Sequence, residues 1–319
     1  MSETVRIGSR LVATGHYQPE RVLTNDEMAT IVETSDEWIK LRTGISTRRI
    51  ARDDETVVDL AEAAGRDALD SGEITADEID LVIVASCTSD QRSPNTAGRV
   101  AQRLGLNGPA IMDINVACSG YVHALAVADQ AIRAGSATTA LVIGAEKLSE
   151  FTDWTDRTTC VLVADAAGAM ILQRTDRPTV SDVTWGSVPE LADAVRIEPP
   201  TGKFAQEGKS VFKWGISAAE GLARKSVRRA GYEVSEIGVF VSHQANLRII
   251  EPLARQLGLT DAIVATDISA SGNTSAASIP LAFSKLYRAD ELPADTPTLL
   301  FGFGGGFAYA GMVIRTPEK

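Results

Sequence analysis

Residues 74–86, ITADEIDLVIVAS, and residues 232–244, YEVSEIGVFVSHQ, share one pattern, in which acidic residues at a turn precede a short apolar run. The same features then follow in the same order after each of them. These are a helix-like stretch ending in RLGL or QLGL, an Asp-Ile pair, a turn of small residues, a second helix-like stretch and a final apolar run. Self-similarity in a fixed order indicates that one folding unit occurs twice.

The apolar runs within each unit are short and continuous, as in LVIV at residues 81–84, which is typical of strands buried on both faces. Helix-period stretches such as ETVVDLAEAAGRDAL lie between them. This alternation predicts an α/β fold of layered sheets and helices, αβαβα, with two halves packed about a pseudo-twofold axis. The polar stretch QRTDRP ends in proline and suggests halves comprising residues 1–173 and 174–319.

Composition narrows the class of protein. The chain has 319 residues, 44% hydrophobic and 23% charged, as expected for a folded protein with a large core. The first residues lack a signal-peptide pattern and no apolar run is long enough to span a membrane, so we expect a soluble, cytoplasmic protein. A net charge of -11 argues against a nucleic-acid partner, and any acidic partner would need a local basic patch.

Cys118 lies in the stretch NVACSGYVHAL, where a strand-like run gives way to a helix-like one. A cysteine of a reducing compartment is most often a small, inert core residue. The start of a helix, however, favours a thiolate, and small neighbours leave room for a substrate. The other two cysteines, Cys87 and Cys160, show no disulfide spacing.

The repeat provides two partners for this thiol. Counted from the Asp-Ile pair of each half, Cys118 and Asn273 fall within one residue of each other at equivalent turns. His243 ends the second-half strand that corresponds to residues 80–85, at the sheet edge where function sits in open α/β folds. We therefore expect Cys118, His243 and Asn273 to converge in one cleft, with His16 and His123 outside it.

Five motifs together are specific to one family of enzymes. They are TSDEWIKLRTGI (34–45), DINVACSGY (113–121), SHQANLRI (242–249), GNTSAASIP (272–280) and FGGGF (303–307). By these motifs the chain, from residue 11 to residue 314, resembles β-ketoacyl-acyl carrier protein synthase III, a condensing enzyme of the thiolase superfamily that starts fatty-acid synthesis.

The resemblance implies a reaction in two stages. Cys118 takes an acyl group from an acyl-CoA as a thioester, and malonyl-acyl carrier protein then loses carbon dioxide to give an enolate. The enolate attacks the acyl-enzyme and yields a 3-oxoacyl-carrier protein. Two neutral donors, His243 and Asn273, would stabilise the enolate oxygen, and the N–H groups of Cys118 and Gly305 would form the oxyanion hole.

The resemblance also implies the contacts to the substrates. No metal or cofactor is implied, but a homodimer is, with the region around residues 81–89 and the following loop as its interface. The implied contacts are Thr34, Trp38, Arg42 and Arg157 for CoA, Gly208 and Asn246 for the pantetheine channel, and Lys213, Arg248 and Arg255 for the carrier protein.

Two departures from the family pattern stand out. ADAAGA at residues 164–169 replaces the common GDGAGA, a change that we expect to be structural. Ser93 stands where some short-chain relatives have a phenylalanine that caps the acyl pocket across the dimer interface. Each buried methylene contributes about 0.8 kcal/mol, so the lost bulk predicts longer or branched acyl primers, with Arg92 as a side chain that could refill the space.

Three alternatives stay open from the sequence. One is a starter-unit synthase or acyltransferase of secondary metabolism with the same fold, and another is a catalytically idle homologue. The third is a zinc site built from the cysteines and His243, although no short ligand pair supports it. The sequence leaves the fold of residues 185–208 unassigned.

Overall fold

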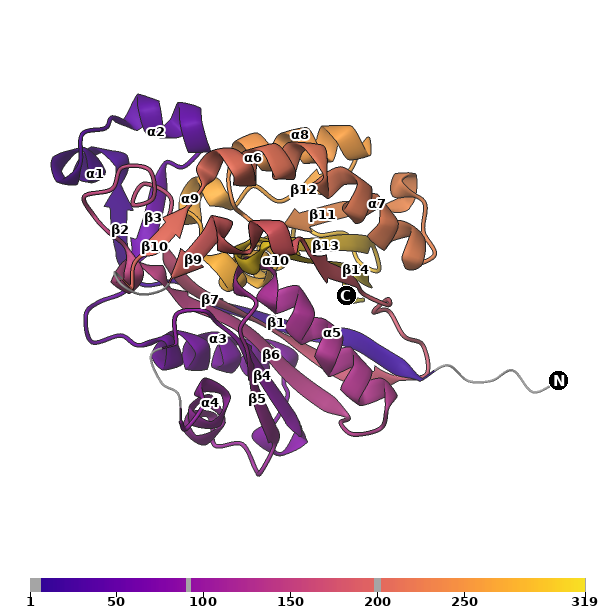
Figure 1. Ribbon diagram of the computed structural model, residues 1–319. Helices are drawn as coiled ribbons and strands as arrows, with labels where there is room; N and C mark the ends of the chain where they lie inside the picture. Colours follow the sequence, from indigo (N-terminus) through magenta and orange to yellow (C-terminus); the bar gives the residue numbers. More distant parts are fainter. Residues whose placement is uncertain (1–6, 90–92, 198–201, 319) are drawn as a thin grey trace.

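Two five-stranded sheets form the framework of the protein (Figure 1). The computed structural model describes residues 7–89, 93–197 and 202–318. The first sheet has the order β1 (Gly8–Tyr17), β7 (Asp165–Thr175), β6 (Thr139–Lys147), β4 (Leu81–Ala85) and β5 (Ala110–Ile114). The second has the order β8 (Thr184–Ser187), β14 (Ala308–Arg315), β13 (Pro297–Phe303), β11 (Val239–Ser242) and β12 (Ile263–Val264).

The two sheets match strand for strand. In each, the first two neighbouring pairs are antiparallel and the last two are parallel. The predicted duplication is therefore confirmed at the level of topology. The proposed division after residue 173 falls within the last residues of β7, which pairs as far as Thr175.

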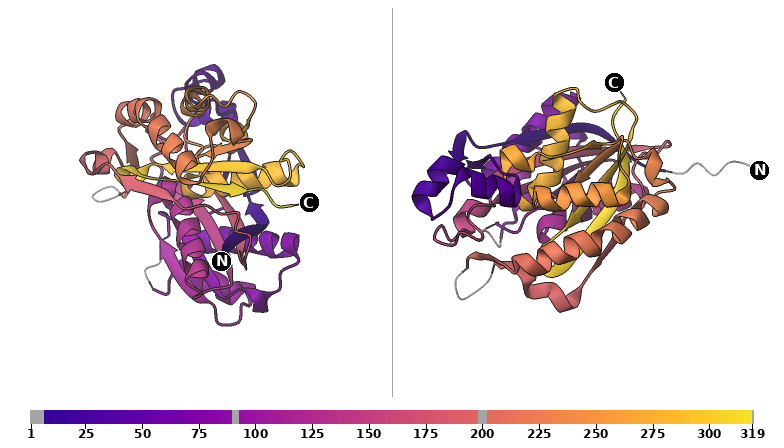
Figure 2. Two further views of the ribbon diagram at one scale, coloured as in Figure 1. Left: turned by 90° about the vertical axis from the view of Figure 1, so that its right-hand side faces the viewer. Right: turned by 90° about the horizontal axis from the view of Figure 1, so that it is seen from above.

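Helices lie on both sides of each sheet, as Figures 1 and 2 show. Two are enclosed between the sheets, two cover the outer face of the first sheet, and three cover the outer face of the second. This is the predicted αβαβα layering. In that order the helices are α5 (Gly120–Arg133) and α10 (Ser278–Arg288); α3 (Val57–Gly72) and α4 (Thr96–Leu104); and α6 (Gly208–Ser217), α7 (Ala219–Arg229) and α8 (Leu247–Leu257).

Strand β4 shows why continuous apolar runs produce this layering. Its alternate residues Leu81, Ile83 and Ala85 join the central core, which also contains α5 and α10. Val82 and Val84 face the opposite way and join the core beneath α3 and α4. Because both faces of the strand are covered by helices, every position is apolar.

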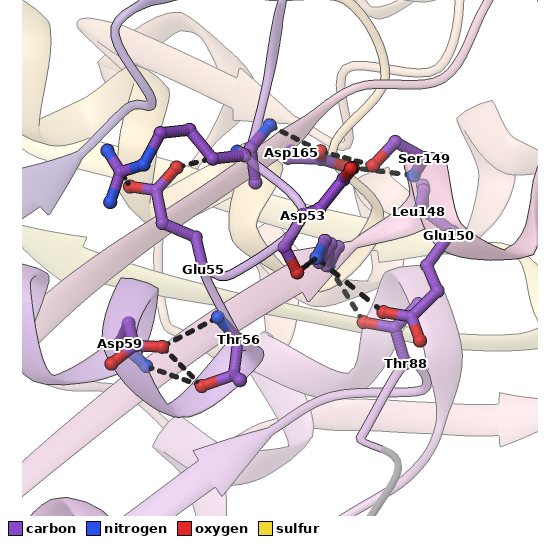
Figure 3. Close-up of polar contacts among 12 residues, drawn as sticks. Asp53, Glu55, Thr56, Asp59, Thr88, Leu148, Ser149, Glu150 and Asp165 are labelled. Atoms are coloured by element: carbon purple, nitrogen blue, oxygen red, sulfur yellow. Dashed lines mark hydrogen bonds and ion pairs between the residues drawn. The ribbon is translucent and has the colours of Figure 1, made fainter.

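Polar side chains fix where two elements begin. The Thr56 hydroxyl accepts the N–H of Asp59, whose carboxylate accepts the Thr56 N–H, so the two residues form a capping box at the start of α3 (Figure 3). Asp165, the fully buried first residue of β7, accepts the N–H groups of Ala51 at 2.8 Å and Ser149 at 2.9 Å (Figure 3). Burial raises the pKa of Asp165 to about 6.

The ADAAGA segment keeps glycine at the position that needs it. A Cβ atom on Gly168 would come within 2.5 Å of the Leu281 backbone nitrogen, at the start of the packed helix α10. Ala164 and Ala166 are themselves completely buried. The extra methyl groups are therefore accommodated in the core, in agreement with a structural change.

A small lobe covers one end of the sheets and borders the site described below. It contains β2 (Arg21–Thr24), α1 (Asn25–Ile31), α2 (Asp36–Thr43) and β3 (Thr47–Ile50). The segment that the sequence left unassigned includes β8, a 3-10 turn at Pro189–Ala194, and the hairpin of β9 (Val195–Ile197) and β10 (Phe204–Gln206).

The strand predicted to lie at the dimer interface is not an edge strand. Residues 81–85 form β4, which is hydrogen-bonded to β6 on one side and β5 on the other, so it has no free edge. The edge strand is β5, where Ile111 and Met112 are 45% and 37% exposed.

No helix in the described parts of the chain has the length and apolar character to span a membrane.

Candidate active site

Cys118 occupies a short 3-10 turn, Ala117–Ser119, which joins β5 to α5. Its side chain is buried at 6% exposure. Ala117 has a φ of +42°, a strained value for a residue with a side chain. The matching turn before α10 contains Ser275 with a φ of +47°, and Phe307 in the turn after β13 has +45°. Such strain gathers at functional sites.

The glycine-rich turn after β13 lies directly against the thiol. A Cβ atom on Gly304 would come within 2.7 Å of the Cys118 sulfur, and one on Gly305 within 2.7 Å of the Ala117 Cβ. Only glycine fits at both positions. The Gly305 N–H acts to lower the pKa of the Cys118 thiol, so it lies on the side of the sulfur where an oxyanion hole would need a donor.

His243 follows the last residue of β11 and is buried at 2% exposure. Its N–H donates to the Phe301 carbonyl at 2.8 Å, and its Nδ1 is 2.8 Å from the Ser278 hydroxyl. The ring packs edge-on against Phe303, with 5.9 Å between centroids. Burial lowers the pKa of His243 to about 3, so the imidazole is neutral at physiological pH.

Asn273 is held on both sides by residues from the other half of the chain. Its N–H donates to the Leu162 carbonyl at 2.8 Å, and its carbonyl accepts the Ala164 N–H at 2.9 Å. The side-chain oxygen accepts the Ser275 N–H at 2.9 Å. The amide NH2 therefore remains as the group that Asn273 can donate to a substrate.

The predicted equivalence of Cys118 and Asn273 is wrong in detail. The turns Ala117–Ser119 and Ser275–Ala277 both lead directly into their helices, which makes Ala276 the counterpart of Cys118. A short helix, α9 (Ile268–Ser271), follows the second Asp-Ile pair and has no counterpart in the first half. Counting from that pair therefore shifts the alignment, yet Asn273 still reaches the same cleft.

A cavity of about 390 Å³ brings the three predicted residues together. Cys118, His243 and Asn273 line it, and it extends past the hairpin to Trp38 and Arg42 on α2. Gly208 and Asn246 also line it, as predicted for a channel. The Asn246 amide NH2 donates to the Arg42 carbonyl at 3.1 Å, and its side-chain oxygen accepts the Arg248 N–H at 2.9 Å. Both polar groups of this side chain therefore form hydrogen bonds within the cavity wall.

Of the predicted CoA contacts, Trp38 and Arg42 line this cavity and Arg157 lies over the Trp38 ring. The Arg157 guanidinium carbon lies 5.0 Å from the centre of the Trp38 ring, and that of Arg42 lies 5.8 Å from it. Arg157 is exposed and donates to the Glu33 carbonyl at 2.9 Å. The buried Thr34 hydroxyl oxygen has no hydrogen-bond partner among the described residues.

Basic side chains lie near the same opening. Arg248 lines the cavity and its guanidinium lies 5.3 Å from the centre of the Phe212 ring. Lys209 also lines the cavity and was missed in the sequence, while Lys213 is exposed one turn further along α6. Arg255 lies two turns beyond Arg248 on α8 and is 3.8 Å from the Glu251 carboxylate.

A second cavity, of about 490 Å³, also lies against Cys118 and shares only Val195 and Phe204 with the first besides that residue. Its other lining residues include Cys87, Leu148 and Ile197. The predicted acyl-pocket residue Ser93 lines neither cavity and is exposed on the single chain. Arg92 lies outside the described residues.

Burial acts against ionisation of Cys118. It raises the pKa of the thiol, and the Ser275 hydroxyl and the Gly305 N–H only partly offset that effect. Burial therefore opposes the thiolate that the start of a helix favours. Two further residues, Ser275 and the buried Glu146, lie around the thiol and were not singled out, although a glutamate inside the apolar run TALVIGAEK was a visible signal.

Comparisons with known proteins agree with this arrangement. Residues 112–189 match the 3-oxoacyl-[acyl-carrier-protein (ACP)] synthase III family and residues 227–316 match its C-terminal domain. The chain is 55% identical over 313 residues to a β-ketoacyl-[acyl-carrier-protein] synthase III of Streptomyces coelicolor, covering 97% of this chain and 99% of the relative.

Two solved structures are also close. One is the priming β-ketosynthase of a polyketide biosynthetic pathway, at 34% identity and a TM-score of 0.95, covering 100% of this chain and 99% of the other. The second is a 3-oxoacyl-[acyl-carrier-protein] synthase III from Aquifex aeolicus, at 38% identity and a TM-score of 0.92, covering 97% and 100%.

The duplicated fold and the buried thiol between its halves define a thiolase-like condensing enzyme, an acyltransferase. Within that class, the chain belongs to the 3-oxoacyl-[acyl-carrier-protein] synthase III family.

Proposed function

We propose that Cys118 accepts the acyl primer from acyl-CoA, and that His243 and Asn273 promote its condensation with malonyl-acyl carrier protein, releasing carbon dioxide and 3-oxoacyl-acyl carrier protein. The observation that carries this proposal is the single cavity that all three residues line and that opens beside Trp38 and Arg42. The cavity would hold the pantetheine arm of CoA first and that of the carrier protein second.

In the acylation stage, the sulfur attacks the thioester carbonyl and CoA leaves. The developing oxyanion would accept hydrogen bonds from the N–H groups of Cys118 and Gly305. The close fit of Gly304 and Gly305 against the thiol fixes these donors before the substrate arrives. Pre-positioned donors of this kind typically contribute a factor of about 10² to 10³ to the rate.

In the condensation stage, His243 and Asn273 would stabilise the enolate that forms as malonyl-acyl carrier protein loses carbon dioxide. The Ser278 hydroxyl accepts the Gln244 N–H at 3.3 Å, which leaves its own proton to donate to Nδ1 of His243. We therefore assign the ring proton to Nε2, so that the neutral imidazole is a donor. The Asn273 NH2 group is the second donor.

At the outer end, adenine would insert between Trp38 and Arg157. A planar base needs about 7 Å between the two groups, twice an ordinary contact distance, whereas they are 5.0 Å apart. The exposed Arg157 side chain would move to admit it. Arg42 and the unpartnered hydroxyl of Thr34 would bind the polar groups of CoA, and Gly208 and Asn246 would flank the pantetheine arm.

The carrier protein would bind at the basic opening. Lys213 and Arg248 would contact its acidic surface, with Lys209 adjacent and Arg255 at the periphery. Opposite charges at an interface direct docking and raise the association rate. An overall charge of -11 would repel an acidic partner, so such a partner needs a local basic patch on the enzyme. These residues would form that patch.

We propose a homodimer formed through β5, whose free edge and exposed apolar side chains suit strand pairing with a second copy. Ser93 would then face the acyl pocket across the interface, where its small size would favour longer or branched primers. No metal or organic cofactor is needed for the proposed chemistry, and we place the enzyme in the cytoplasm.

Two measurements test the proposal. Incubation with acyl-CoA should add the mass of one acyl group per chain, and Cys118→Ala should abolish the adduct. Addition of malonyl-acyl carrier protein should then release carbon dioxide and form the 3-oxoacyl product. A protein without an adduct would be an idle homologue.

The likeness to a priming β-ketosynthase of a polyketide pathway favours one alternative, a starter-unit synthase or acyltransferase of secondary metabolism. An acyltransferase would form the adduct but pass it to an alcohol or amine without releasing carbon dioxide. The condensation product therefore separates these two reactions.

A further inference from the structure

Glu146, on β6, is a carboxylate with no solvent exposure that lies close to the active-site thiol. Its oxygens accept hydrogen bonds from neutral groups only. Among the described residues no lysine or arginine forms an ion pair with it. The donors are the hydroxyls of Ser86 at 3.2 Å and Thr88 at 2.5 Å, the Cys87 N–H at 3.1 Å, the Cys87 thiol at 3.3 Å and the Ala276 N–H at 3.3 Å.

Ser275 lies between this carboxylate and the nucleophile. It lines the second cavity together with Cys118, its hydroxyl is 3.7 Å from the Cys87 sulfur, and the N–H of the next residue, Ala276, donates to Glu146. The Ser275 hydroxyl acts to lower the pKa of both Cys118 and Glu146, against the larger effect of burial. The strained backbone at Ser275 and the bond from its N–H to Asn273 hold the hydroxyl in place. A hydroxyl can accept one proton while donating its own, so it can relay a proton between two groups.

We propose that Glu146, acting through Ser275, is the base that removes the proton of Cys118 during acylation. This inference rests on the proposed role of Cys118 as the nucleophile. The Cys118 proton passes to the Ser275 oxygen, and the original Ser275 proton passes to Glu146. The sulfur forms its bond to the acyl carbon, and the bond between that carbon and the CoA sulfur breaks. The CoA thiolate takes a proton from solvent.

The surrounding groups explain why such a base is needed. Burial keeps Cys118 in its thiol form, because it raises the pKa of that group. His243 does not supply the base, since its Nδ1 is occupied by Ser278 and the ring proton lies on Nε2. Burial also raises the pKa of Glu146, and a more basic carboxylate is a better proton acceptor near neutral pH.

Burial also determines what happens to the transferred proton. Glu146 is completely enclosed, and in this proposal its proton leaves by the path on which it came, through Ser275. The proton is held on Glu146 while the acyl-enzyme exists. When carbon–carbon bond formation expels the sulfur as a thiolate, the proton returns to it. The enzyme thus recovers its starting protonation state after each turnover.

The test is the pH profile of single-turnover acylation, followed by intact mass after mixing with octanoyl-CoA. At pH 7 we expect Glu146→Gln and Ser275→Ala to slow acylation about 100-fold, the lower range for loss of a general base. The deficit should shrink as the pH rises and the thiol ionises without help. Ser226→Ala removes a buried hydroxyl far from the site and is the matched control.

Other outcomes would overturn the inference. If Glu146 acts only through its charge, its removal would lower the pKa of Cys118 and acylation would be faster than in the wild type. If it only supports the fold, the loss would be the same at every pH. Failure of the proposed function is distinguishable, because the wild type itself would then form no adduct.

Proton exchange with solvent gives a second readout that does not depend on how well a variant folds. In the wild type at pH 7, formation of the acyl-enzyme should remove about one proton per active site from a weakly buffered solution containing a pH indicator, since CoA leaves as a thiol. A value of zero in the wild type would contradict storage of the proton on Glu146.

Discussion

Asn273 and Val163 form an isolated parallel β-bridge that joins the two halves of the chain beside the nucleophile. The neighbouring residues Val161 and Leu162 line the cavity that leads to Cys118. The wall of the cavity and the Asn273 amide are therefore one connected piece of main chain. A side-chain change at Asn273 leaves these backbone bonds intact, which makes the position suitable for testing chemistry separately from folding.

Asn273→Asp should impair decarboxylation far more than acylation. A carboxylate cannot donate to the enolate oxygen and repels its charge, so we expect carbon dioxide release from malonyl-acyl carrier protein to fall about 100-fold or more. Formation of the acyl adduct, measured by intact mass, should change less than about threefold, because the oxyanion donors for that stage are elsewhere. Equal loss of both stages would contradict the assigned roles.

Trp38→Ala should weaken the use of acyl-CoA without altering the chemistry. Loss of the aromatic face removes the stacking surface for adenine, and a loss of about 1.4 kcal/mol corresponds to a tenfold rise in KM. The kcat should stay near the wild-type value. Leu41→Ala, at a 71% exposed position on the same helix, is the control. A fall in kcat with unchanged KM would argue against a CoA contact.

Ser93→Phe should shift primer preference towards acetyl-CoA. The added ring would occupy space that longer chains need, and each methylene excluded from the pocket forfeits about 0.8 kcal/mol, or about fourfold in kcat/KM. The measurement is a series of kcat/KM values for acetyl-, isobutyryl-, octanoyl- and dodecanoyl-CoA. A wild-type enzyme that strongly prefers acetyl-CoA over the other three would refute the predicted role of Ser93.

Ile111→Lys, on the exposed edge strand β5, should convert the proposed homodimer to monomers. A lysine on a free strand edge opposes pairing with another strand. Sedimentation velocity at micromolar concentration would show the change in mass. Val22→Lys alters a similarly exposed apolar residue, 39% exposed, on a different strand and should leave the dimer intact. If both variants stay dimeric, the interface lies on another surface.

Asp165 should make stability depend on pH between about 4 and 6. Its pKa is about 6 in the folded protein and about 3.8 when unfolded, so the folded state binds more protons in this window. Stability is therefore lost as the pH rises from 4 to 6, by about 3 kcal/mol from this group. Asp165→Asn should flatten this part of the curve of unfolding free energy against pH, whereas Asp176→Asn, at an exposed position, should not.

Most of the fold was predictable because its strands are buried on both faces. Apolar runs such as LVIV can be identified as strands from the local sequence alone. Because the runs recur in the same order, they also show which strands of the two halves correspond. The edge of the first sheet was not predictable in this way. Apart from Asp113, AIMDI in β5 is apolar like a core strand, but most of its side chains are exposed on the single chain, and the pairing order shows that it is an edge strand.

Some residues of the candidate site could also be predicted from the sequence, and others could not. Cys118, His243 and Asn273 were found because each sits at the end of a repeated element. Their alignment was miscounted because α9 adds a turn in one half only. Ser275 and Glu146 come from separate segments that meet only in three dimensions, and no spacing in the sequence relates them.

The sulfur of Cys118 borders two cavities that share few side chains. The first would bind the pantetheine arms of CoA and of the carrier protein in succession. The second would hold the acyl chain of the primer. If the two cavities have these proposed roles, most of the side chains that select the acyl chain differ from those that bind the carrier. Substitutions at Cys87, Leu148 or Ile197, which line only the second cavity, would then change primer length without changing carrier docking.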